Sequence, residues 1–106
     1  MDKREAVRVP VRVRARCHCL GVVIEGYVED LSRSGMFLRA ANAVGTGSSA
    51  EIDLDVAGEE PLRLEAEVVR IERAGRRVGM AFRFIDQLAT KRTLANFIMR
   101  QHQSAQ

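Results

Sequence analysis

Residues 9–19 alternate between apolar and polar side chains, and this alternation limits the possible folds more than any other feature of the sequence. The apolar positions are Val9, Val11, Val13, Ala15, Cys17 and Cys19, and the polar positions are Arg12, Arg14, Arg16 and His18. A period of two over this length predicts a half-buried strand with a basic outer face. Pro10 fits the start of such a strand, where no backbone donor is needed.

Five further segments have strand character, and one has helical character. The predicted strands are 22–29, 36–40, 51–56, 62–73 and 78–84, separated by a turn at Leu20-Gly21, a loop over 41–50 and glycine turns near 58–61 and 74–76. The apolar phase of the fifth strand slips at Val69, which indicates a β-bulge or a sharply bent strand. The small residues Gly79 and Ala81 indicate that something packs closely on one face of the last strand.

The last segment changes from a period of two to helical spacing. Leu88, Leu94, Phe97, Ile98 and Gln101 follow this spacing over 86–103, with Asp86 as N-cap. Strands joined by hairpins and followed by one helix favour a mainly β fold, an antiparallel barrel or sandwich whose helix packs on the barrel or on a partner. The 106 residues suit one domain, 1–106, with a flexible basic arm (1–8), a barrel (9–84) and the helix.

The turn at Leu20-Gly21 also predicts which residues of the first two strands face each other. In an antiparallel hairpin centred there, the numbers of paired residues sum to about 41. Arg8 then lies opposite about Arg33. The basic arm is thereby brought beside the polar stretch Asp30-Leu31-Ser32-Arg33-Ser34-Gly35.

Positive charge is concentrated at the start of the chain. The net charge is +3, yet residues 3–16 contain six basic side chains against one acid, Glu5. This distribution indicates an anionic partner. Arginine, which dominates here, suits bidentate recognition of phosphate or guanine, although a GC-rich genome would also enrich arginine.

The polar stretch can be an ordinary turn or one wall of a site. Asp30 and Ser32 can cap backbone amides, and Gly35 can adopt a positive φ that reverses the chain. If Asp30 lies beside Arg4 and Arg8, however, its carboxylate can also take part in binding a ligand. Guanine accepts from arginine on one edge and donates to a carboxylate on another, so a ligand with both guanine and phosphate would satisfy this set. A bare phosphate would be repelled by Asp30.

Two motifs in this chain resemble those of PilZ domains, bacterial receptors for cyclic di-GMP. Arg4-Glu5-Ala6-Val7-Arg8 matches RxxxR, and the polar stretch matches [D/N]xSxxG, at the family's order and separation. The resemblance covers nearly the whole chain and implies a six-stranded antiparallel barrel with a C-terminal helix. It implies that Arg4 and Arg8 clamp the ligand while Asp30, Ser32 and Gly35 form the barrel-side wall.

Lys3 and Arg33 complete the predicted ligand-binding residues. Many family members have another arginine directly before RxxxR, which influences how many ligand molecules bind, and this chain has Lys3 there. The resemblance also suggests that the arm closes over the dianionic ligand and so changes a docking face for a partner protein. The expected ligand is cyclic di-GMP, with no cofactor.

The expected function is therefore a receptor or adaptor that regulates a partner in motility, exopolysaccharide production or signalling. One alternative is a PilZ-like adaptor that acts through protein contacts without binding the nucleotide. Another is a nucleic-acid-binding barrel using Arg12, Arg14 and Arg16, although that face lacks aromatic stacking groups. An enzyme is not expected, because His18 and His102 have no evident nucleophile or orienting partner.

Metal and membrane sites are not expected either. Cys17 and Cys19 share one strand face while His18 points to the other, so the three cannot converge on a metal ion. Asp53 and Asp55 fit a solvated strand face. No apolar run is long enough for a membrane helix and no signal segment is evident, so the cytoplasm is the expected location.

Overall fold

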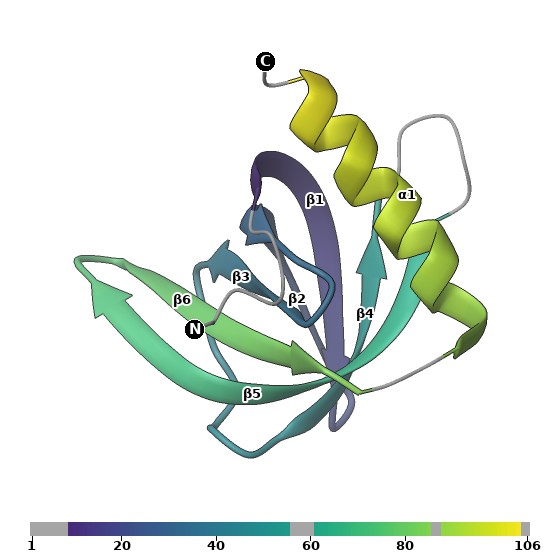
Figure 1. Cartoon of the computed structure of the whole chain (residues 1–106). Helices are drawn as coiled ribbons and strands as arrows, with labels where there is room; N and C mark the ends of the chain where they lie inside the picture. The colour runs from purple at the N-terminus through teal and green to yellow at the C-terminus, as the bar shows by residue number, and fades with distance from the viewer. Residues whose placement is uncertain (1–8, 56–60, 86–87, 105–106) are drawn as a thin grey trace, which may run out of the picture.

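The chain forms a closed barrel of six antiparallel strands with one helix packed against it (Figure 1). The computed structural model describes residues 9–55, 61–85 and 88–104, and the side chains of 13–55, 61–85 and 92–100. The elements are β1 (Val9–Cys19), β2 (Val22–Leu31), β3 (Gly35–Ala40), β4 (Ser49–Leu54), β5 (Leu62–Ala74), β6 (Arg77–Phe84) and α1 (Leu88–Ser104). The strands follow the order β1-β2-β3-β6-β5-β4, and β4 pairs with β1 to close the barrel. The predicted barrel is confirmed over the predicted sandwich.

The β1–β2 hairpin has the predicted register. Arg14 pairs with Tyr27 and Cys19 with Val22, which gives the expected sum of 41. A register shift between Pro10 and Val13 lowers the sum by one, so that Pro10 pairs with Asp30. Leu20 and Gly21 both have positive φ, 52° and 78°, as a two-residue turn of type I′ requires.

The predicted alternation places one face of each strand in a shared aliphatic core. In β1 the side chains of Ala15, Cys17 and Cys19 are buried, whereas Arg14 is exposed. Leu94, Phe97 and Ile98 of α1 are buried in the same core, and α1 contacts β1 and β5. The helix therefore packs on the barrel, as one of the two sequence-based alternatives predicted. Its predicted N-cap, Asp86, lies outside the described residues.

The phase slip in the fifth strand is a bulge. The register of β5 against β6 shifts between Val68, which pairs with Phe82, and Arg70, which pairs with Ala81. Val69 is the extra residue and is exposed, while Ile71 packs against the core. The bulge lets the longest strand bend around the barrel, visible in Figure 1 as the strong curve of β5.

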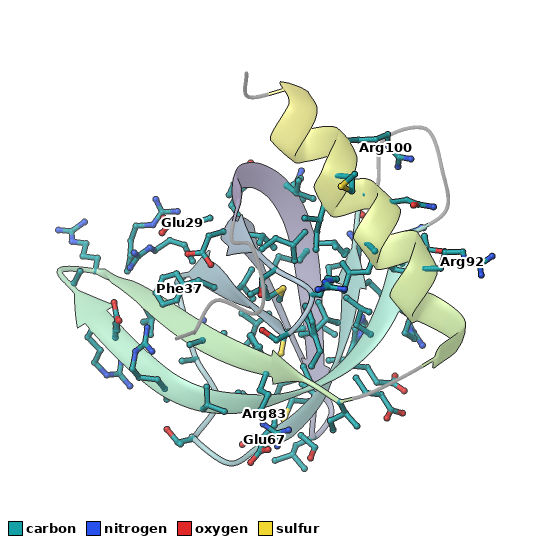
Figure 2. The ribbon with its side chains drawn as sticks, viewed as in Figure 1. Glu29, Phe37, Glu67, Arg83, Arg92 and Arg100 are labelled. Atoms are coloured by element: carbon teal, nitrogen blue, oxygen red, sulfur yellow. The ribbon has the colours of Figure 1, made fainter. Side chains whose placement is uncertain are left out.

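The outer face of the barrel carries ion pairs between neighbouring strands. Arg83 of β6 pairs with Glu67 of β5 (Figure 2). Arg63 of β5 donates to both carboxylate oxygens of Asp53 on β4, at 2.8 and 3.0 Å, and His18 Nε2 lies 3.0 Å from Asp53 Oδ2. Only 14% of the Asp53 side chain is exposed. The hydrogen bonds from Arg63 hold the pKa of Asp53 below its usual value, with a smaller contribution from His18.

The lowered pKa of Asp53 predicts a pH-dependent contribution to stability. A carboxyl group whose pKa is lower in the folded state stabilises the fold above its unfolded pKa and loses this effect as the pH falls. We expect Asp53→Asn to reduce the free energy of unfolding at pH 7 by about 1 kcal/mol, a figure discounted for the exposure of Arg63. Urea denaturation at pH 7 and near pH 2 should show this difference shrinking in acid. A difference equal at both pH values would contradict the assignment.

Candidate functional site

The turn between β2 and β3 is organised around the buried hydroxyl of Ser32. Only 1% of Ser32 is exposed, and its Oγ accepts hydrogen bonds from the backbone amides of Ser34 and Gly35, each at 3.2 Å. The Ser32 amide in turn donates to the Gly35 carbonyl at 2.9 Å. The hydroxyl is also 3.1 Å from Ser34 Oγ and 3.3 Å from the Gly35 carbonyl. Because the Ser32 hydroxyl forms hydrogen bonds within the turn, its role in the predicted site is to fix the conformation of the turn.

Gly35 is needed for a different reason from the one that the sequence suggested. The predicted positive φ is wrong, because the described glycines with positive φ are Gly21, Gly47 and Gly75. A Cβ at Gly35 would instead lie 2.1 Å from the Phe82 carbonyl oxygen on β6. The strands approach so closely here that no side chain fits. Next to this contact, the Phe84 amide donates to the Ser34 carbonyl at 2.8 Å and ties the turn to the end of β6.

Asp30 and Arg33 lie on either side of Ser32. Asp30 is half-buried and pairs with Pro10 of β1 on one side and with Phe37 of β3 on the other. Arg33 is exposed. The structure thus places the carboxylate-bearing residue beside the start of β1, where the basic arm of the sequence joins the barrel.

Phe37 and Arg39 form a packed layer on the outer face next to Asp30. Phe37 is only 8% exposed, because its ring covers Gly79 so closely that a Cβ there would lie 2.1 Å from Phe37 Cζ. The Arg39 guanidinium lies 5.0 Å from the centre of this ring and donates two hydrogen bonds of 3.1 Å to Glu29. Figure 2 shows Glu29 and Phe37 near each other on one side of the barrel. The close packing predicted at Gly79 is confirmed, although the sequence did not identify Phe37 as its partner.

Three of the predicted ligand-binding residues, Lys3, Arg4 and Arg8, lie outside the described residues and remain predictions. The other predicted residues, Asp30, Ser32, Arg33 and Gly35, lie at the end of β2, in the turn after it and at the start of β3.

The Cys-His-Cys cluster is split between two faces, as predicted. Cys17 and Cys19 are buried free thiols, and burial raises the pKa of Cys17 to about 11, which favours its protonated form at neutral pH. His18 lies on the outer face against Asp53. Within the described ranges, no group of three His, Cys, Asp or Glu side chains is arranged to hold a metal ion. Nor does any described helix have the length and apolarity needed to cross a membrane.

Comparison with known proteins gives one family and several similar structures. The family model of the PilZ domain matches residues 2–100. The PilZ domain with c-di-GMP of YcgR from Escherichia coli is 17% identical, with a TM-score of 0.84 over 98% of this chain and 95% of that chain. The PilZ domain of CeSA from a cellulose-synthesising bacterium is 20% identical, with a TM-score of 0.70 over 88% of this chain and 95% of that chain.

Longer proteins contain the same fold as a part. The Bacillus subtilis inhibitor of motility MotI is 16% identical, with a TM-score of 0.83 over 98% of this chain. This chain spans 53% of MotI and 48% of the longer YcgR structure. At such identities the structural likeness concerns the fold alone. A search of curated proteins found no match.

The contact at Gly35 generates a prediction about the turn. Gly35→Ala should lower the free energy of unfolding by about 3 kcal/mol, because a new Cβ would meet a backbone oxygen that cannot rotate away. Gly45→Ala is the matched control, since its nearest neighbour would be Ser48 Oγ at 4.0 Å and its φ is not positive. The control should change stability by no more than about 0.5 kcal/mol. Equal urea denaturation midpoints for the two variants would show that β3 and β6 do not need this close approach.

Proposed function

Because this chain belongs to the PilZ domain family, we propose that it is a receptor module for cyclic di-GMP that regulates a partner protein. PilZ domains are ligand-binding receptor and adaptor modules rather than enzymes, and their homologues act in motility and cellulose synthesis. We propose the same class of output here, through a partner in motility, exopolysaccharide production or signalling.

The observation that carries this proposal is the pairing of Asp30 with Pro10. Asp30 lies at the edge of a turn whose Ser34 and Gly35 amides bond to the Ser32 hydroxyl. Arg8 precedes Pro10 by two residues in the sequence, so we expect its guanidinium near a ligand bound beside Asp30. Guanidinium groups suit phosphate and guanine, and a carboxylate suits the N1-H and N2-H edge of guanine.

The proposed mechanism uses the arm as the moving part and the barrel as the fixed part. The Ser32 turn is tied to β6, because the Phe84 amide donates a hydrogen bond to the Ser34 carbonyl. Lys3, Arg4 and Arg8 then order around the ligand, and the charge-assisted hydrogen bonds offset the lost entropy of the arm. The partner responds to the rearranged surface, and no bond in the ligand is broken. At the position before RxxxR, Lys3 would offer a single point charge, whereas an arginine would offer two parallel hydrogen-bond donors. This difference bears on how many ligand molecules bind.

The nucleic-acid alternative finds less support on the described face of β1. Arg16 pairs with Asp55 at 3.1 Å, and Arg14 lies 3.6 Å from Glu25 and 5.8 Å from the centre of the Tyr27 ring. These arginines are thus already matched by carboxylates from neighbouring strands. A face so neutralised offers little to a phosphate backbone.

Calorimetric titration of the full chain with cyclic di-GMP tests the proposal. We expect saturable binding to the wild type, and a 10- to 100-fold weaker affinity in Arg8→Ala and in Asp30→Ala, since each removes about 1.5–3 kcal/mol of charge-assisted hydrogen bonding. Arg14→Ala, which removes an exposed arginine paired with Glu25, is the matched control and should bind like the wild type.

The same titration separates the two adaptor hypotheses. Absence of heat at concentrations of tens of micromolar, in a chain that remains folded, would reject the receptor and favour an adaptor that works without the nucleotide. Undiminished binding in Arg8→Ala would reject the proposed role of the arm.

A further inference from the structure

The β5–β6 hairpin extends beyond the strand that pairs with the other side of β5. β4 pairs with β5 from Leu62 to Glu67, and two further hydrogen bonds of 2.7 and 3.0 Å continue this side as far as Val68. β6, by contrast, follows β5 to its end at Ala74. Figure 1 shows this end of the hairpin projecting from the barrel. Among the described strands, none pairs with this side of β5 over 69–74, which we call the open edge.

The backbone groups of Ile71 and Arg73 point to the open edge. Neighbouring residues of a strand direct their N–H and C=O to opposite sides. The Phe84 amide points to the β3 side, where it donates a hydrogen bond of 2.8 Å, so Gly79 of the same strand points to β5 and its partner Glu72. Ile71 and Arg73, on either side of Glu72, therefore direct an N–H and a C=O each away from β6. Within the described part of the chain, these four groups have no hydrogen-bond partner.

An unpaired strand edge can receive a further strand. Several peptide-binding domains add an extended segment to such an edge, and the backbone hydrogen bonds supply the affinity. Only another polypeptide has the alternating amide donors and acceptors that the open edge needs. A nucleic acid or a lipid headgroup has no such row, so the backbone of the open edge selects an extended polypeptide segment.

The same end of the hairpin carries three arginines without a carboxylate partner. Arg73, Arg76 and Arg77 are exposed, and across the described ranges their side chains form no ion pair. Every other arginine side chain described within a strand is paired, namely Arg14, Arg16, Arg39, Arg63, Arg70 and Arg83. The neighbouring acid Glu72 is itself bound by Arg70 at 2.9 Å. Unmatched positive charge is therefore concentrated beside the open edge.

A second copy of the chain fits the open edge poorly. An antiparallel pair of edges centred on Glu72 places two glutamates opposite each other, and one centred on Arg73 places two arginines opposite each other. Like charges directly opposite destabilise a pair of strands. A pair centred on Ile71 brings the end of β5 against Val68, whose backbone is already bonded. The unmatched arginines select instead a segment that carries carboxylates.

We propose that the open edge of β5 binds an extended, acidic segment of a partner protein as an added strand. The backbone of the segment pairs with Ile71 and Arg73, and its aspartate or glutamate side chains pair with Arg73, Arg76 and Arg77. The proposal rests on the proposed function only in that the chain acts through a partner protein. It names the surface and the chemistry of that contact.

Amide hydrogen exchange, followed by NMR on the full chain, tests the open edge before any partner is known. In the free protein the amides of Ile71 and Arg73 should exchange faster than the amide of Glu72, because only the last is bonded to β6. Equal protection of all three amides would show that the edge is covered in the free chain, and would overturn the proposal.

A labelled acidic peptide tests the occupant. The probe is a short fluorescein-labelled peptide in which glutamate alternates with threonine, a residue that favours strands. Fluorescence polarisation should show saturable binding that weakens as salt is added. In the complex the amides of Ile71 and Arg73 should become protected from exchange. Absence of binding, or binding without this protection, would overturn the proposal.

Two control peptides of the same length separate charge from strand pairing. One has lysine in place of glutamate, and the other keeps the glutamates but has N-methylated backbone amides. Each should bind at least about tenfold more weakly than the probe. Equal binding by the N-methylated peptide would reject strand addition. Tighter binding of a labelled DNA duplex than of the probe, or a dimer of the free chain in sedimentation, would show a different occupant and would also overturn the proposal.

Matched variants locate the binding. The triple variant Arg73→Gln, Arg76→Gln, Arg77→Gln should raise the Kd of the probe at least about tenfold. Arg92→Gln removes an exposed arginine of α1, labelled in Figure 2, and should leave the Kd unchanged. Equal Kd values for the triple variant and the wild type would overturn the assignment of the arginines.

Proline at position 73 tests the backbone contact separately from the charge. Arg73→Pro and Arg73→Gln both lack the guanidinium, and only proline also lacks the N–H. Because this N–H points away from β6, the proline leaves the β5–β6 hydrogen bonds in place. Arg73→Pro should therefore bind the probe more weakly than Arg73→Gln. Equal Kd values for the two variants would reject strand pairing at this residue.

Nucleotide titration separates the failure of this proposal from that of the receptor function. The hairpin end lies beside Ala40 of β3, whereas Gly35 and the turn before it lie at the opposite end of the β3–β6 pairing. The triple variant should therefore bind cyclic di-GMP like the wild type. A protein that binds the probe but gives no heat with the nucleotide would reject the receptor function and support the strand addition. The reverse result would reject the strand addition alone.

Discussion

Closure of the barrel depends on the pairing of β3 with β6, and this pairing depends on two positions without a side chain. At Gly35 the Phe82 carbonyl occupies the space of a Cβ, and at Gly79 the Phe37 ring does so. The two glycines lie on opposite strands near opposite ends of the pairing. The Phe84 amide of β6 also binds the Ser34 carbonyl, so the pairing of β3 with β6 sets the position of residues 30–35.

Features that rest on local signals could be predicted from the sequence. The Leu20-Gly21 turn set the register of the first hairpin, because antiparallel strands joined by two residues leave little freedom. The change of apolar phase at Val69 identified the bulge, since a pleated strand reverses its faces only by adding a residue. The same hairpin register placed Asp30 beside the beginning of β1. The position of Asp30 could therefore be predicted from the Leu20-Gly21 turn and the alternation of apolar residues in the first two strands.

Features that rest on contacts between distant strands could not be predicted in the same way. Gly35 suggested a positive φ, because a glycine between polar residues is most often a turn signal. Its actual constraint comes from β6, which is far away in the sequence and whose pairing with β3 has no local signature. Phe37 likewise has the outward phase of its strand, and only the missing side chain of Gly79 lets it be buried. The roles of Lys3, Arg4 and Arg8 remain predictions from the motif.

The distribution of charge bears on which part of the chain can meet an anionic ligand. The outer-face arginines of β1 whose side chains the structure describes are matched by carboxylates of neighbouring strands, Arg14 by Glu25 and Arg16 by Asp55. A face matched in this way offers little net positive charge to a phosphate group. The proposed recognition of the ligand therefore depends on the basic residues that precede β1 in the sequence rather than on the arginines of the strand itself.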